Sequence, residues 1–181
     1  MRRGGAVLDK GQERRALGLV WRIFDSAESR EIHVARGEAV HQGARHLLAC
    51  WQASEREGRF TVGRDIPSRE LARVLESVAL FQPVPPDDFL VRLAGEAMRR
   101  RHGRDVSGAR LSDLMDAPRF ACESARWRTL LENAQPFIEE VRVMEDGRVG
   151  LCYESVVLRV LAADGVTPWV MTGIFFHDWR A

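Results

Sequence analysis

The sequence predicts an α+β fold: a five-stranded antiparallel sheet with helices on one face, preceded by an N-terminal helical extension. Two observations lead to this prediction. The last third of the 181-residue chain contains two Asp-Gly pairs between stretches rich in branched and aromatic residues, and an apolar hairpin pattern lies earlier in the chain. Asp-Gly readily supplies the positive φ angles of tight hairpin turns, so we expect three consecutive strands there.

Residues 1–40 form the predicted extension, which we expect to be partly helical. The extension contains an apolar stripe with the i, i+3, i+4, i+7 spacing typical of a helix, made of Leu17, Val20, Trp21 and Phe24. A clearer helical stripe follows, made of Val40, Ala44, Leu47, Leu48 and Trp51. We expect residues 41–181 to be one domain that opens with this second helix.

The middle of the chain predicts a hairpin followed by helices. The apolar run 78–84 reads as a buried strand, and the alternation of Phe89, Val91 and Leu93 indicates its partner, so the hairpin spans residues 78–94. A short helix should end near Gly103. Pro118 is well placed as the first residue of a longer helix over about 118–134.

The three C-terminal strands are expected at 137–145, 148–162 and 166–176, with Asp-Gly pairs between them. The hairpin and these strands can join into one sheet. Gly173 lies inside the last strand, where the missing side chain allows a bend or the close approach of a helix or ligand.

Composition restricts the classes of function. The formal net charge of +1 selects no nucleic acid partner, and the three cysteines have no spacing typical of zinc or disulfide frameworks. No apolar run approaches the ~18 residues of a membrane span, so we expect a cytoplasmic protein without a membrane partner. The basic run 99–102 is interpreted as a solvated helix end rather than a phosphate site.

Short sequence pieces, taken in order, resemble a PAS-like family with many bacterial members, in which a short N-terminal helix precedes a minimal PAS core. The pieces cover about residues 44–178 and lie at residues 47–51, 64–67, 89–95, 103–108, 153–154 and 171–176. The resemblance implies a sensory or signalling module that binds a small ligand or a signalling protein partner. It also implies that the flanking helix at Leu17–Phe24 covers the sheet or pairs with a second subunit in a homodimer.

The cofactor chemistries that the resemblance implies have little support in the residues. Haem binding in that fold uses a histidine on the long helix, and residues 118–134 contain none; Cys122 is the only softer candidate ligand there. Covalent flavin attachment uses a cysteine in a stretch corresponding to residues 103–116, which has none. Covalent flavin and histidine-ligated haem are therefore disfavoured, and the cofactor stays open.

The candidate ligand-binding residues are three aromatic side chains expected to point inward and one arginine in an apolar strand: Trp127, Tyr153, Phe175 and Arg92. Arg92 would hold an anionic group or pair with Glu154. A solid core without a ligand is an equally weighted alternative, because apolar pockets are common but not universal in such folds.

Two other functions stay open beside the sensory module. A cone-shaped α+β enzyme of the ketosteroid-isomerase type would need a buried Asp or His base that faces an apolar pocket. A ligand-free interaction scaffold would have a filled core. The sequence contains no GxSxG motif, dinucleotide fingerprint or P-loop, so we expect no enzyme of those classes.

Overall fold

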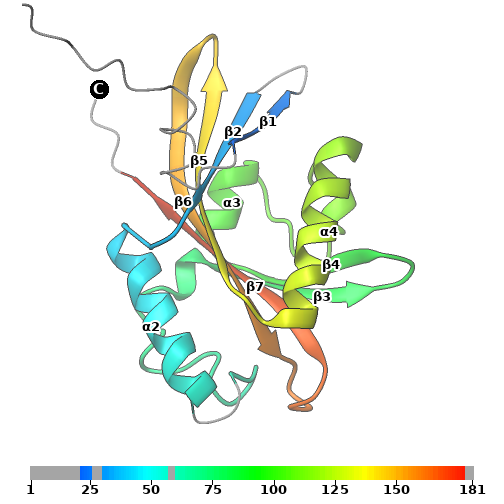
Figure 1. Cartoon of the computed structure of the whole chain (residues 1–181). Helices are drawn as coiled ribbons and strands as arrows, with labels where there is room; N and C mark the ends of the chain where they lie inside the picture. The colour runs from blue at the N-terminus through cyan, green and yellow to red at the C-terminus, as the bar shows by residue number, and fades with distance from the viewer. Residues whose placement is uncertain (1–20, 26–29, 57–59, 178–181) are drawn as a thin grey trace, which may run out of the picture.

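The computed structural model describes residues 21–25, 30–56 and 60–177, which form one α+β unit (Figure 1). Its helices are α2 (Gln42–Arg56), α3 (Glu96–His102) and α4 (Ala117–Asn133), with short 3₁₀ turns at Leu75–Ser77 and Leu111–Asp113. Its strands are β1 (Trp21–Asp25), β2 (Arg30–Arg36), β3 (Val78–Val84), β4 (Asp88–Ala94), β5 (Phe137–Glu145), β6 (Arg148–Leu161) and β7 (Pro168–Phe176).

The strands form one antiparallel sheet in the order β1-β2-β5-β6-β7-β3-β4. The predicted hairpin and C-terminal strands are present, and they join because β3 pairs with β7 from Val78 opposite Gly173 onward. The β5–β6 turn has φ angles of 50° at Asp146 and 75° at Gly147, the conformation that Asp-Gly was expected to supply. The pairs between β3 and β7 therefore join residues 89 to 95 positions apart in the sequence.

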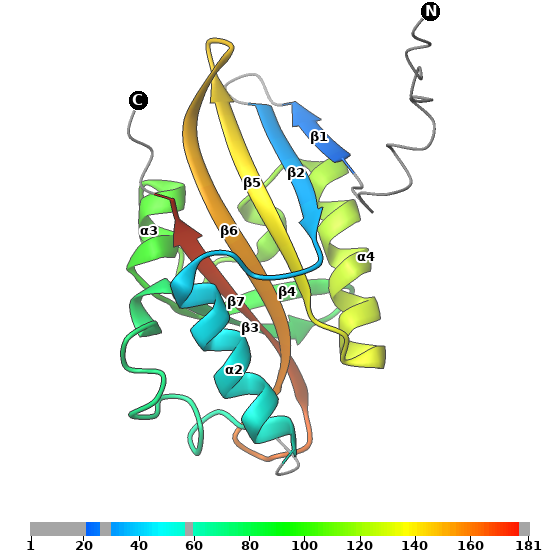
Figure 2. The same ribbon diagram turned by 60° about the vertical axis from the view of Figure 1, so that its left-hand side comes forward.

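The sheet is wider than predicted because β1 and β2 continue it beyond β5 (Figure 2). The helical prediction for the extension is wrong at residues 21–25, which form a strand paired with β2; Leu17 and Val20 of the same stripe lie outside the described residues. β2 pairs with β5 along its whole length, from Arg30 opposite Met144 to Arg36 opposite Ile138. Residues 21–25 therefore join the sheet through β2, a pairing that their own helix-like periodicity does not show.

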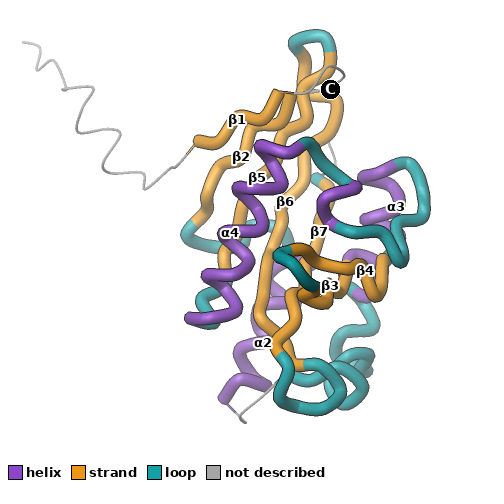
Figure 3. Tube along the Cα trace, turned by 90° about the vertical axis from the view of Figure 1, so that its right-hand side faces the viewer, coloured by secondary structure: helices purple, strands orange, loops and turns teal. Residues whose placement is uncertain are grey.

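Helices cover both faces of the sheet, so the prediction of helices on one face holds for α3 and α4 only. In Figure 3, α3 and α4 lie on the side of the sheet toward the viewer and α2 lies behind it. Adjacent strand residues separate accordingly: Val157 packs in the core beneath α4, and Leu158 packs in the core beneath α2. The sheet is the shared wall of two hydrophobic cores.

The close approach predicted at Gly173 is made by α2. A Cβ placed on Gly173 would lie 2.6 Å from Cδ2 of Leu47 and 2.7 Å from the ring of Phe175. The missing side chain therefore lets α2 rest directly on β7. A second anchor is the buried carboxylate of Glu154, which accepts hydrogen bonds from the backbone N–H groups of Val40 (2.9 Å) and His41 (3.3 Å) just before the helix begins.

Candidate functional site

A cavity of about 80 Å³ lies between the sheet and the layer formed by α3 and α4. Apolar side chains form much of its wall, among them Phe81, Met98, Leu111, Leu114, Val141 and Ile174. Polar groups enter from the sheet at Tyr153 and Thr172, and from the helices at Arg101, Arg119 and Trp127. An apolar hollow with a few convergent polar groups is the usual form of a small-molecule site.

Trp127 lies on the buried face of α4 and points inward, as predicted. The helix begins after Asp116, whose carboxylate accepts a hydrogen bond from the Arg119 N–H (2.9 Å), and Pro118 lies in its first turn. The Trp127 ring meets Phe81 and Phe89 edge to face, with centroids 4.7 and 5.0 Å apart. These contacts fix the indole against the cavity.

Three polar atoms of the cavity wall are buried without a hydrogen-bond partner in the described part of the chain: Nε1 of Trp127, Oγ1 of Thr172 and Nε of Arg119. Trp127 is 5% exposed and Thr172 6% exposed, so bulk solvent does not compensate them. An unsatisfied buried donor costs about 1–3 kcal/mol, and such groups are rare in native proteins. These atoms lack the acceptor that a ligand or an ordered water would supply.

Beside the cavity, β2 joins the two helices through buried charges. Glu31, which is 2% exposed, pairs with Arg101 of α3 and with Arg119 of α4, whose Nη2 lies 2.6 Å from its Oε2. The ring of His33 reaches Glu31 through Nε2 and Glu139 through Nδ1, each at 3.1 Å. Nε of Arg101 also donates to the Tyr153 hydroxyl at 3.1 Å. The polar wall is therefore held by ion pairs between segments far apart in the sequence.

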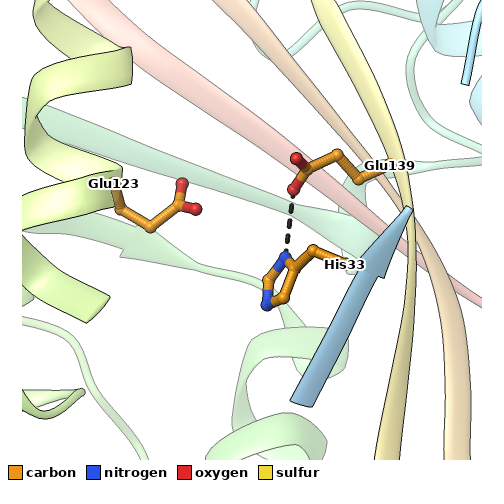
Figure 4. Close-up of side chains that lie close together, drawn as sticks. All are labelled: His33, Glu123 and Glu139. Carbon is orange, nitrogen blue, oxygen red and sulfur yellow. Dashed lines mark hydrogen bonds and ion pairs between the residues drawn. The ribbon is translucent and has the colours of Figure 1, made fainter. Parts of the chain in front are cut away.

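His33, Glu123 and Glu139 lie close enough together to be compared with a metal site. Their ligand atoms are within 4.8 Å of one another, and Figure 4 shows Glu123 of α4 pointing toward the other two. The Arg126 guanidinium, however, already bridges the carboxylates, at 3.0 Å from Glu123 and 2.5 Å from Glu139. A metal ion would have to displace this cation, so the cluster is better described as an ion-pair network.

The network shifts two titrations. Burial raises the pKa of Glu139, but hydrogen bonds from His33 and Arg126 and their charges outweigh it and lower the pKa to about 2. Burial lowers the pKa of His102, and the charges of Arg101 and Arg119 lower it further, to about 4. At neutral pH the cavity therefore has an ionised Glu139 and a neutral imidazole at His102.

The structure brings together two of the four predicted ligand-binding residues. Trp127 and Tyr153 both line the cavity. Phe175 lies on the opposite face, in the core beneath α2, where it stacks on His41 with centroids 5.3 Å apart. Arg92 is exposed on the edge strand β4, and its predicted pairing with Glu154 is wrong, because that carboxylate binds the backbone before α2.

Sequence reasoning missed the polar half of the site. Glu31 and His33 alternate with Ile32 and Val34, and this period of two was the available signal for a strand. The interpretation of the basic run as a solvated helix end is wrong for Arg101, whose side chain is 15% exposed and paired with Glu31. Cys122, the softer haem candidate, is half-buried on α4 and is not part of the cavity wall.

Comparison with known proteins identifies no family for the chain, because no family model, curated protein or solved structure matches it. Within the described residues, no helix combines the length and apolar character needed to cross a membrane.

Proposed function

We propose that the protein is a PAS-like sensory module that binds a small ligand between the sheet and α3 and α4, and passes the change to its flanking segments. The observation that carries this proposal is the cavity wall itself. Trp127 Nε1 and Thr172 Oγ1 are buried at the cavity and have no partner among the described side chains and backbone. A bound molecule with hydrogen-bond acceptors would satisfy them.

The topology supports the same proposal. The hairpin β3–β4 and the three C-terminal strands share one sheet, and the helices between them in the sequence cover the face that holds the cavity. This arrangement fits the resemblance of the sequence pieces to a PAS core, in which a ligand lies between sheet and helices. Fold alone does not decide function, and the unpartnered atoms of the cavity wall are the stronger support for the proposal.

The route by which a ligand would act leads through β2. Arg101 and Arg119 line the cavity, and both pair with Glu31 on β2, which follows β1 and comes before the other described elements. A ligand that shifts α3 or α4 would therefore change the geometry of these buried pairs, and the strand that carries them would respond. Transmission through a homodimer or a partner protein is part of the proposal, and light scattering with and without ligand would measure the dimer.

The proposed function is tested by following the indole N–H of Trp127. In a ¹H–¹⁵N spectrum the five tryptophans give separate indole signals, and Trp127→Phe assigns the one at the cavity. A chemically mixed small-molecule library should contain members that shift this signal saturably while the Trp169 signal, beneath the other face, stays in place. If no molecule moves the Trp127 signal, the protein is the ligand-free scaffold and the proposal fails.

A general-base enzyme is the second candidate, and His102 is the observation that favours it. This imidazole lines the cavity, and burial together with Arg101 and Arg119 lowers its pKa to about 4. It is therefore unprotonated at pH 7, as a general base must be, but a weaker base than an ordinary histidine. An enzyme would convert a bound library member, whereas a sensor would release it unchanged. Product analysis by mass spectrometry after long incubation separates the two functions.

A further inference from the structure

The charges around the cavity are unevenly distributed. Glu31 pairs with two guanidiniums, those of Arg101 and Arg119, whereas Arg126 pairs with two carboxylates, those of Glu123 and Glu139. The end of the cluster at Arg119 therefore has one positive charge in excess, and the end at Arg126 has one negative charge in excess.

The unpartnered atoms are of one chemical kind. Trp127 Nε1 and Arg119 Nε are N–H donors, and the Thr172 hydroxyl can donate as well. Arg119 uses its Nη2 for Glu31, so its Nε remains for another acceptor. The molecule that completes this wall must therefore supply acceptor oxygens, and the excess positive charge favours an anionic one.

We propose that the ligand of the cavity is a small monocarboxylate, whose oxygens accept hydrogen bonds from Arg119 Nε and Trp127 Nε1. This inference rests on the proposed function and names its ligand class. The carboxylate neutralises the excess positive charge at the Arg119 end of the cluster, and its hydrocarbon part lies against the apolar wall at Met98, Leu111 and Ile174. A cavity of about 80 Å³ restricts the hydrocarbon part to a few carbon atoms.

The inference is tested by calorimetric titration of the full chain with matched probes. Acetate, propionate, butyrate and pyruvate are compared with acetamide, propionamide and butyramide, which have nearly the same shape without the charge. We expect the best carboxylate to bind at least about tenfold more tightly than its amide, because hydrogen bonds to a charged group are roughly twice as strong as neutral ones.

Paired variants separate the site from general effects on the protein. Trp127→Phe keeps the ring and removes the N–H, and Thr172→Val keeps the shape and removes the hydroxyl. Their controls are Trp169→Phe, beneath the other face, and Thr61→Val, a buried and unpartnered hydroxyl outside the cavity wall. We expect the site variants to weaken carboxylate binding about fivefold or more and the controls to leave it within a factor of two.

The outcomes distinguish this inference from the function on which it rests. Carboxylate binding that prefers the acid over the amide and is lost in Trp127→Phe supports it. Equal binding of acid and amide overturns the ligand class and leaves the ligand site standing. The same conclusion follows if library molecules shift the Trp127 indole signal but no carboxylate does. If nothing binds and ordered water alone fills the cavity, both proposals fall.

Discussion

At the scale of single residues, the polar side of the cavity consists of charged side chains that are buried only because they are paired. Glu31 satisfies two arginines and one histidine from a position that is 2% exposed. Removing one partner of a buried ion pair leaves an uncompensated charge, which costs more than the pair itself contributes. Glu140 on the neighbouring strand β5 serves as the comparison for Glu31. It also pairs with two arginines, but the side chains of these partners, Arg36 and Arg142, are 34% and 40% exposed.

We therefore expect Glu31→Gln to lower the free energy of unfolding by about 3 kcal/mol. The same substitution at Glu140 should cost about 1 kcal/mol or less, because solvent screens its arginine partners. Urea unfolding of both variants at pH 7 measures the difference. Equal losses would show that the Glu31 cluster is not a buried network.

The free energy of unfolding should also depend on pH, chiefly through His102. The pKa of His102 falls from 6.5 to about 4 on folding, so between these values the unfolded chain binds a proton that the folded chain does not. Stability should therefore decrease as pH falls from 6.5 to 4, by on the order of 2 kcal/mol. Glu139, with its pKa lowered to about 2, adds a further loss between about pH 4.5 and 2.

The contribution of His102 to the pH dependence of stability is measured by urea unfolding at pH 7, 5.5 and 4.5, with the parent protein and His102→Gln compared at each pH. The variant should lack most of the decrease between pH 6.5 and 4.5, because glutamine does not titrate there. A decrease of the same size in both proteins would assign the effect to other groups.

At the scale of elements, α2 is held against the sheet by a missing side chain. Gly173→Ala would place a methyl group 2.6 Å from Leu47, inside a packed core that has no room for it. We expect a loss of about 1–3 kcal/mol in the free energy of unfolding. Gly37→Ala is the control, since nothing lies within 4 Å of its Cβ position, and it should leave stability nearly unchanged.

The same scale shows how far the sequence determines the fold. Apolar periodicity and Asp-Gly pairs predict α2, α4, the hairpin and the C-terminal strands, because each depends on local residues. β1 is different: Trp21 and Phe24 fit a helical stripe, yet residues 21–25 form a strand paired with β2. The arginine partners of Glu31 lie 70 and 88 residues away, so no local pattern identifies them as a site.

At the scale of the whole molecule, one sheet serves two cores. Trp51 of α2 packs in one core and Trp127 of α4 packs in the other, and strands β3, β6 and β7 contribute to both cores. A shared sheet should make the described domain unfold in a single cooperative step. The fold therefore links the cavity beneath α3 and α4 to the stability of the opposite face.

We predict that Leu158→Ala, beneath α2, lowers the free energy of unfolding by about 2–5 kcal/mol. Leu158 is fully buried and does not line the cavity. Denaturant titrations followed separately at the Trp51 and Trp127 indole signals should give one midpoint, shifted equally in the variant. Two different midpoints would show that the cores unfold independently.

The central claim is that the cavity beneath α3 and α4 is a ligand site, and a crystal structure after soaking with small acceptor-bearing fragments tests it most directly. We predict electron density for a fragment in the cavity, with an oxygen atom of the fragment within hydrogen-bond distance of Trp127 Nε1. The claim is contradicted if fragments bind only elsewhere while that nitrogen donates to a protein group or to water.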